Sequence, residues 1–235
     1  MSYIITDDKH YKNIANAIRG KLSTDTQYHP EDMSIAINNI PSSADGTDDP
    51  VVGIYFTNPD KDGYPTKAKI VGWRLDNKET AFPIVFTDLK FKRLQTIEFL
   101  DCDFKLFQNY ICQGLLSLTS IKLPDTLMSI GTSAFYQCPN LTSINFPNTL
   151  TSIDSSAFQN CRGLVDVTLA NGFNCNNLDL SSSTKFTRET IVSWLNALAD
   201  RTGLTAYKLT IGATNLAKLT EEDILIATNK NWTLA

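Results

Sequence analysis

Hydrophobic and polar positions repeat with a fixed period through the middle of the chain. The segment that begins at Leu118 and ends at Pro124 returns as the segment from Leu141 to Pro147, with each position 23 residues further on. A third copy begins at Leu164 and then decays. A more degenerate copy precedes these three. Self-similarity at a period of roughly 20 to 50 residues is typical of stacked repeats, and the pattern predicts about three to four coils.

Each copy carries the pattern of one short strand followed by a return. Ile121 and Leu123 are two positions apart, so their side chains share one face of a strand, and Pro124 ends that strand because it cannot donate to a ladder. The apolar pair Leu127 and Ile130 follows, and then a Ser-Ala-Phe segment, which predicts a short helical or 3₁₀ return. One such coil cannot bury its own apolar face, so neighbouring coils must stack around a common core.

The repeating unit resembles a known family. The segment Ile130-Gly-Thr-Ser-Ala-Phe-Tyr-Gln-Cys138, continued to Pro147, is similar to the BspA-type leucine-rich repeat. This resemblance covers residues 93–182 and implies an α/β fold, a leucine-rich-repeat solenoid whose short strands stack into one parallel sheet. It also implies a role in adhesion and in protein or matrix binding at bacterial surfaces. The chain departs from the family pattern at Cys112, where a phenylalanine is expected, and in its last copy, which lacks the proline and the Ala-Phe pair.

Residues 183–235 change character and predict a strand-helix C-terminal cap. Thr187 is placed to cap a helix with a single apolar stripe. That stripe consists of Ile191, Trp194, Leu195 and Leu198. A strand is expected next, and then a second helix that starts at Thr220 with Asp223 in a capping-box position, before a final strand at 232–234. Solenoids need such an end to cover their last apolar face.

The N-terminal part predicts three further segments. Residues 1–40 read as a helical hairpin, with Thr6 capping the first helix and Pro30 in the first turn of the second. Residues 41–50 have the composition of a linker. Residues 51–92 predict a β-rich N-terminal cap. Its expected strands lie at 51–56, 67–73 and 82–86.

Short segments at both ends resemble proteins of bacteriophages. The pattern from Ala17 to Ile40 is similar to segments of phage tail and baseplate-associated proteins. Residues 209–234 are similar to the C-terminal part of repeat proteins encoded in prophages of gut Firmicutes. The first resemblance implies attachment to an assembly and a homo-oligomer formed through residues 1–45. A plain amphipathic helical hairpin is the alternative interpretation.

Composition and charge limit the classes of partner. An apolar share of 42% and a charged share of 20% fit a folded protein. The net charge is −4 and the basic residues are spread along the chain, so the clustered basic footprint of a nucleic-acid-binding protein is missing. No stretch approaches the roughly 18 apolar residues that cross a bilayer, and no secretory signal begins the sequence. We therefore expect no nucleic-acid or membrane partner. We expect the protein to be cytoplasmic before assembly into a virion, or to reach the cell surface or extracellular space by another route.

The five cysteines form an odd set that cannot all pair within one chain. Cys138 and Cys161 occupy the same phase of the repeat, so they would stack between adjacent coils. Each is then either a small buried hydrophobe or one half of a disulfide, and the spacing leaves both open. His10 and His29 lie far from the cysteines in sequence, so the ligand spacing of a zinc site is missing.

Candidate chemistry is confined to one turn. The segment Asn58-Pro-Asp60-Lys-Asp62-Gly63 matches the first half of a calcium loop, with oxygen donors at alternate positions and a glycine for the turn. Lys69 stands where the closing acid should be, which favours a simple hairpin turn over a Ca²⁺ site. Nucleophile-and-base signatures and glycine-rich phosphate loops are missing. We therefore predict no catalytic residue, no enzyme activity and no cofactor.

The solvent-facing positions of the repeat strands form the candidate ligand-binding face. They are Thr96, Glu98, Ser120, Lys122, Ser143, Asn145, Asp166 and Thr168. The face is polar and lacks an aromatic side chain that could serve as a hot spot. The face predicts a non-enzymatic binding or structural protein that recognises a protein or cell-surface glycan. The resemblances at the two ends of the chain imply that this is a phage or prophage tail-associated or receptor-binding protein. The alternatives are a bacterial cell-surface BspA-like adhesin, and an ordinary exposed sheet that binds nothing.

Overall fold

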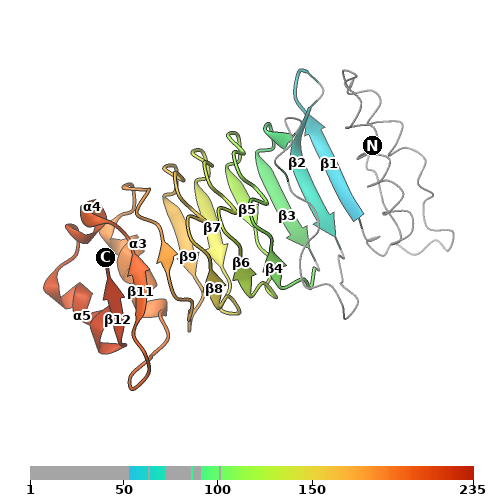
Figure 1. Cartoon of the computed structure of the whole chain (residues 1–235). Coiled ribbons are helices and arrows are strands. Elements are labelled where there is room, and N and C mark those ends of the chain that lie inside the picture. Colours follow the sequence, from blue (N-terminus) through green and yellow to red (C-terminus); the bar gives the residue numbers. More distant parts are fainter. Residues whose placement is uncertain (1–52, 63, 72–85, 87–90, 101) are drawn as a thin grey trace.

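The described part of the chain is a solenoid that runs from an N-terminal hairpin to a helical C-terminal end (Figure 1). A computed structural model describes residues 53–62, 64–71, 86, 91–100 and 102–235. The predicted helical hairpin at 1–40 and the linker at 41–50 lie outside the described residues. Within them, no helix combines the length and the apolar character needed to cross a bilayer.

Six strands form the main sheet. In spatial order they are β1 (Gly53–Pro59), β2 (Pro65–Val71), β3 (Thr96–Leu100), β5 (Ser120–Lys122), β7 (Ser143–Phe146) and β9 (Asp166–Leu169). All neighbours after β2 pair in parallel, as the repeat predicts, while β1 pairs antiparallel with β2 as a hairpin. The leucine-rich-repeat solenoid of α/β class is thereby confirmed, and the first two strands of the predicted N-terminal cap, β1 and β2, belong to the same sheet. Residues 82–85 of the third expected strand lie outside the described residues.

A second ladder, which the repeat pattern did not predict, lines the return side of the coils. It contains β4 (Leu106–Phe107), β6 (Ser129–Ile130) and β8 (Ser152–Ile153), all paired in parallel. The short helical or 3₁₀ return expected after this ladder is instead a series of turns with two left-handed residues per coil. The left-handed positions are Tyr110, Ser133 and Ser156, and then Gly114, Gln137 and Asn160. Consecutive helical geometry is incompatible with such residues, which corrects that expectation.

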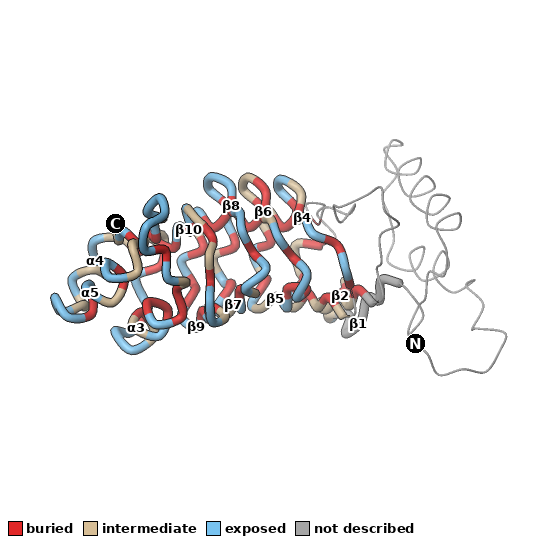
Figure 2. The backbone as a smooth tube through the Cα atoms, turned by 90° about the horizontal axis from the view of Figure 1, so that it is seen from below, coloured by how far each residue is buried: buried red, intermediate tan, exposed pale blue. Residues whose placement is uncertain are grey.

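The core lies between the two ladders, where buried residues follow each other along the axis (Figure 2). Phe107, Phe135 and Phe158 stand in successive coils, with ring centroids 6.1 Å and 5.1 Å apart. Phe146 meets Phe158 edge-on at 5.3 Å. Each of these four rings is at most 2% exposed. The aromatic column therefore joins coils that are distant in sequence into one core.

Threonine hydroxyls and cysteine thiols form hydrogen bonds between neighbouring coils. Thr126 Oγ1 donates to backbone carbonyls of the preceding coil, and Thr149 Oγ1 does the same one coil later, within 2.9 Å of the carbonyl oxygens of Asp125 and Leu127. The thiols of Cys138 and Cys161 also donate to carbonyl oxygens of preceding coils, at 3.1 Å and 3.0 Å. These bonds satisfy backbone acceptors that the strands leave unpaired.

All five cysteines are buried free thiols, which answers the question left open by the shared phase of Cys138 and Cys161. Burial raises the pKa of the Cys138 thiol to about 12 and that of Cys175 also to about 12. Burial also raises the pKa values of Cys112 and Cys161. These thiols fill space as small apolar groups and donate weak hydrogen bonds.

The C-terminal cap has the predicted alternation of strands and helices. Its elements are β10 (Leu178–Asp179), α3 (Arg188–Ala197), β11 (Tyr207–Thr210), α4 (Ala213–Leu216), α5 (Glu221–Asn229) and β12 (Trp232–Leu234). Thr187 caps α3, and Thr220 with Asp223 forms the expected capping box of α5. Strands β10, β11 and β12 form a third, parallel sheet. The single-turn helix α4 was not predicted.

Charged side chains tie the two long helices of the cap together. Arg188 at the start of α3 makes two 2.7 Å hydrogen bonds to the carboxylate of Asp223, which is 6% exposed. Lys230, just after α5, donates to the carbonyl oxygens of Leu195, Asn196 and Leu198 at the end of α3. The positive charge at that helix end also complements the helix dipole. The cap is therefore held at both ends of α3.

Candidate functional site

The structure brings the eight predicted face residues together on the solvent side of the main sheet. Strand pairing places Thr96, Ser120, Ser143 and Asp166 in one column, and Glu98, Lys122, Asn145 and Thr168 in a second column. The residues between them are buried, so each strand alternates between solvent and core. This alternation follows from the two-residue period of a strand.

Two lysines extend these columns beyond the predicted set. Strand β2 pairs in parallel with β3, which places Lys67 opposite Thr96 and Lys69 opposite Glu98. Ala68 and Ile70, between and after them, are fully buried. The alternation Lys-Ala-Lys-Ile indicated a strand, but β2 is not a copy of the repeat. Nothing in its local pattern could therefore show that it lies beside β3.

The β2 end of the face is electrostatically distinct from the rest. Lys67 Nζ lies 2.6 Å from Glu98 Oε1, while Lys69 Nζ lies 3.9 Å from Glu98 Oε2. Lys122 continues the second column on the far side of Glu98, and no ion pair to it is found in the described ranges. Two ammonium groups thus lie within 4 Å of the Glu98 carboxylate, and the residue that pairs with Glu98 on β5 is a third lysine, Lys122. On β7 the face is uncharged, and on β9 it carries one acid, Asp166.

The hydroxyl of Thr96 on this face is buried. Within the part of the chain that the structure describes, Thr96 Oγ1 has no hydrogen-bond partner, although Thr96 belongs to a solvent-side column. Lys67 lies opposite Thr96, and its ammonium group reaches Glu98, two residues further along β3. A buried hydroxyl without a partner is costly, and such groups are uncommon in folded proteins.

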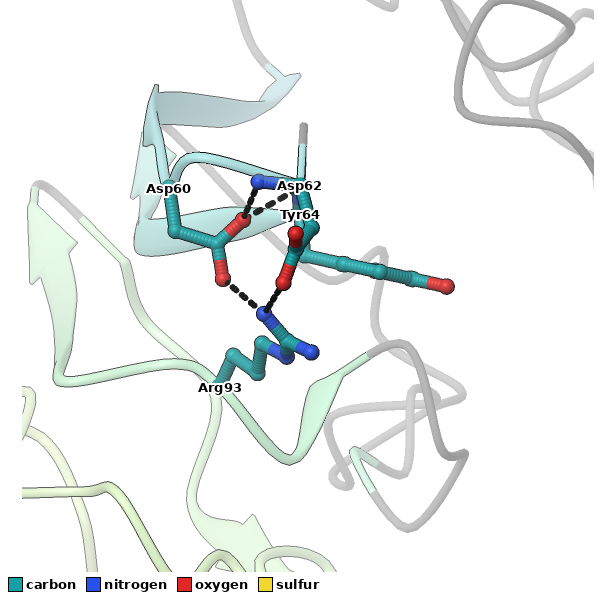
Figure 3. Close-up of polar contacts among 4 residues, drawn as sticks. All are labelled: Asp60, Asp62, Tyr64 and Arg93. Carbon is teal, nitrogen blue, oxygen red and sulfur yellow. Dashed lines mark hydrogen bonds and ion pairs between the residues drawn. The ribbon is translucent and has the colours of Figure 1, made fainter.

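The candidate calcium turn forms the tip of the β1–β2 hairpin, and its acids bind an arginine (Figure 3). Asp60 Oδ1 accepts the backbone N–H groups of Asp62 and Tyr64, at 2.9 Å and 3.0 Å. Arg93 donates to the other oxygen of Asp60 and to Asp62, and its guanidinium lies 4.7 Å from the centre of the Tyr64 ring. Arg93 lowers the pKa of Asp60, with further lowering from the backbone bonds. Asn58 lies in β1.

This arrangement gives the turn a structural role. Arg93 stands three residues before β3, so its contacts with Asp60 and Asp62 pin the hairpin tip to the start of the repeats. In the described ranges, no three His, Cys, Asp or Glu side chains gather as a metal-binding group. His10 and His29 lie outside those ranges. The groups on the sheet face can donate and accept hydrogen bonds and form ion pairs, which is the chemistry of recognition.

Comparison with known proteins locates the repeats. Residues 90–198 match the family described as BspA type Leucine rich repeat region, in six copies. The match begins near the predicted boundary at 93 and continues past 182 into α3. It leaves out both segments that resemble phage proteins. No curated protein matches the chain.

Solved structures similar to this chain include three leucine-rich-repeat proteins. A leucine-rich-repeat protein of T. pallidum has 18% identity and a TM-score of 0.32, with 66% of this chain and 68% of that chain covered. One from Bacteroides ovatus has 17% identity and a TM-score of 0.29, with 71% and 42% covered. A leucine-rich cell surface protein of Faecalibacterium prausnitzii has 14% identity and a TM-score of 0.27, with 63% and 41% covered. The chain thus spans about two fifths of the last two. Residues 90–198 of this chain are thus similar to the BspA-type leucine-rich-repeat region, and they fold as a solenoid.

Proposed function

We propose that this chain is a non-enzymatic binding protein of the adhesin type, which holds a protein partner on the solvent side of its main sheet. The observation that carries this proposal is the pair of solvent-side columns, in which ten polar side chains from five parallel strands share one face. Parallel pairing sets neighbouring strands about 4.8 Å apart, so each column offers polar groups at a regular spacing.

The face is suited to broad contact. Its uncharged residues on β5, β7 and β9 have short side chains that both donate and accept hydrogen bonds. They are Ser120, Ser143, Asn145 and Thr168. Short side chains lose little rotamer entropy on binding. Because none of these ten positions is aromatic, we expect binding energy to be spread over many contacts.

The cell surface is the setting that we favour, because adhesion to proteins or matrix is what the BspA-type resemblance implies. A phage-tail role stays a prediction that rests on the resemblances at residues 17–40 and 209–234. That role expects self-association through residues 1–45. Light scattering of the full chain and of a version starting at residue 46 distinguishes the two settings, because only a tail component should change from an oligomer to a monomer on truncation.

The test of the binding face compares two bulky double variants from the same coil. S143W/N145W blocks β7 in the main sheet. S152W/D154W adds the same bulk in β8 and at the residue just after it, in the second ladder, which is a separate sheet. All four positions are on the surface, so both variants should keep the circular dichroism and melting temperature of the parent. Adhesion to immobilised extracellular-matrix proteins should fall only in S143W/N145W. Equal adhesion by both variants would place the binding surface elsewhere.

A further inference from the structure

The solvent side of the main sheet is polarised along the solenoid axis. At the β2 end, Lys67, Lys69 and Lys122 stand on the two strands that flank Glu98, which gives these four residues a formal charge of +2. The chain as a whole carries −4, so this basic end runs against the overall balance. The exposed fractions of the Lys67 and Lys69 side chains are 27% and 42%, and Lys122 is exposed.

Within this basic end, the carboxylate of Glu98 already forms an ion pair with Lys67. Glu98 pairs closely with Lys67, which leaves Lys69 at 3.9 Å and Lys122 with no ion pair in the described ranges. Lys69 and Lys122 stand on either side of β3, and two strand spacings amount to about 10 Å. An extended peptide advances about 3.3 Å per residue, so about three residues of a partner would bridge the two lysines.

The unpartnered hydroxyl of Thr96 is an independent sign of a missing acceptor. Thr96 lies between Lys67 and Ser120 in the first column, and its hydroxyl makes no hydrogen bond within the described residues. A partner carboxylate that binds over the first column and displaces the side chains around Thr96 would accept a hydrogen bond from this hydroxyl. Hydrogen bonds to a charged acceptor are stronger than bonds between neutral groups.

The rest of the face favours a peptide over a polyanionic glycan. A sulfated polymer carries negative charge on nearly every sugar, which Glu98 at the centre and Asp166 at the far end of the face would repel. A peptide can place acids over the β2 end and neutral groups over β7 and β9. Its backbone amides can bond to side chains such as Ser143 and Asn145.

We propose that Lys69, Lys122 and Thr96 form a carboxylate-binding subsite, which takes an acidic, extended segment of the protein partner. This proposal rests on the proposed function and names the partner's chemistry. It also sets the partner's direction, with its acidic residues over β2 to β5 and its uncharged residues over β7 to β9.

The experiment uses the full chain and a fluorescein-labelled peptide of alternating Glu and Ser, read by fluorescence anisotropy. K69E/K122E should weaken binding about tenfold or more, because two attractive charges become repulsive. K105E/K208E changes the net charge by the same amount, at exposed lysines that lie off the face. Its affinity for the Glu-Ser peptide should stay within about twofold of the parent's affinity. Salt should weaken the parent's binding, because the screening length falls from about 10 Å at 0.1 M to about 3 Å at 1 M.

T96V tests the hydroxyl separately. Valine has nearly the same shape, so this variant should bind the Glu-Ser peptide about threefold more weakly while its melting temperature does not fall. Equal binding of the Glu-Ser peptide by both lysine double variants would overturn the subsite. So would a matched Lys-Ser peptide that binds as tightly, or a sulfated polysaccharide that binds in place of the Glu-Ser peptide.

These outcomes separate the two proposals. If S143W/N145W abolishes matrix adhesion but K69E/K122E leaves Glu-Ser affinity unchanged, the acidic-segment proposal falls and the binding face stands. If K69E/K122E weakens binding of the Glu-Ser peptide but matrix adhesion is the same in S143W/N145W and S152W/D154W, the carboxylate-binding subsite is supported and the adhesin-type function is contradicted.

Discussion

The indole Nε1 of Trp194 donates a 2.6 Å hydrogen bond to the backbone carbonyl oxygen of Val167, so a side chain of α3 closes the last edge of the main sheet. β9 has β7 on one side and α3 packed beyond it. Trp194 itself is fully buried, and Phe186 meets it edge-on at 4.7 Å. An open edge strand is a template for unwanted pairing, and covering it with a helix removes that risk.

Replacing Trp194 by Phe should lower the free energy of unfolding by about 1 to 3 kcal/mol, because the carbonyl of Val167 loses its buried donor. Urea denaturation followed by circular dichroism measures the change. V165A, at a position 42% exposed just before β9, is the control and should stay within about 0.5 kcal/mol of the parent. An unchanged midpoint in W194F would mean that this hydrogen bond does not support the edge.

Replacing Phe158 by Ala should cost about 3 to 5 kcal/mol, because the ring is 2% exposed and contacts Phe135 and Phe146 in one column. Chemical denaturation is again the measurement. Leu225 is 51% exposed, so L225A provides an exposed truncation that should cost little. Comparable losses in F158A and L225A would argue against a continuous aromatic core.

Replacing Thr149 by Val should destabilise the protein by about 1 kcal/mol, because it removes the hydroxyl that bonds Asp125 and Leu127 of the preceding coil. T149S keeps the hydroxyl and should retain most of the stability. Thr168 is exposed on β9, and T168V should be nearly neutral. A T149S variant as unstable as T149V would assign the loss to packing of the methyl group.

Acid should weaken the C-terminal cap through Asp223. The backbone N–H of Thr220 and the side chain of Arg188 lower the pKa of this carboxyl below its ordinary value of 3.8. Because the folded-state pKa is depressed, the stabilisation is present above the unfolded-state value and is lost as pH falls through the folded-state value. The melting-temperature gap between the parent and D223N should therefore be largest near neutral pH and shrink below about pH 4. A gap that does not change with pH would contradict this linkage.

The five thiols should be inert in the native protein, since all are buried and burial raises the pKa of Cys138 and Cys175 to about 12. The thiolate is the reactive form, so Ellman's reagent at about pH 8 should react slowly until denaturant is added. All five thiols should then react. Fast reaction of one thiol before unfolding would show that its coil opens locally.

Several features of the fold could be predicted from local pattern. The period of 23 residues placed Ile121 and Ile144 in the core, and the caps at Thr187 and Thr220 followed from the residues just after them. The second ladder was harder to predict, because two-residue strands such as β6 carry too few positions to show alternation. The turns after this ladder contain residues with a left-handed backbone, among them serine and glutamine. These residue types rarely adopt that conformation, so the sequence does not predict it.

In the candidate site, too, some positions could be predicted from the sequence and others could not. Its eight predicted positions lie on one face because each strand has a two-residue period, which is written in the sequence of every copy. Lys67 and Lys69 join that face only because β2 pairs with β3, and Arg93 helps to hold the β1–β2 hairpin there through Asp60.

The sequence by itself determined the repeat, the buried and exposed face of each strand and the helix caps, since all of these arise between residues close along the chain. Only the tertiary structure decided that β2 lies beside β3, so that lysines stand on both strands that flank Glu98. It also decided that, among the described residues, the hydroxyl of Thr96 has no hydrogen-bond partner. These features depend on hydrogen bonds and ion pairs between segments far apart in the chain. A local sequence pattern does not predict which of these segments come into contact.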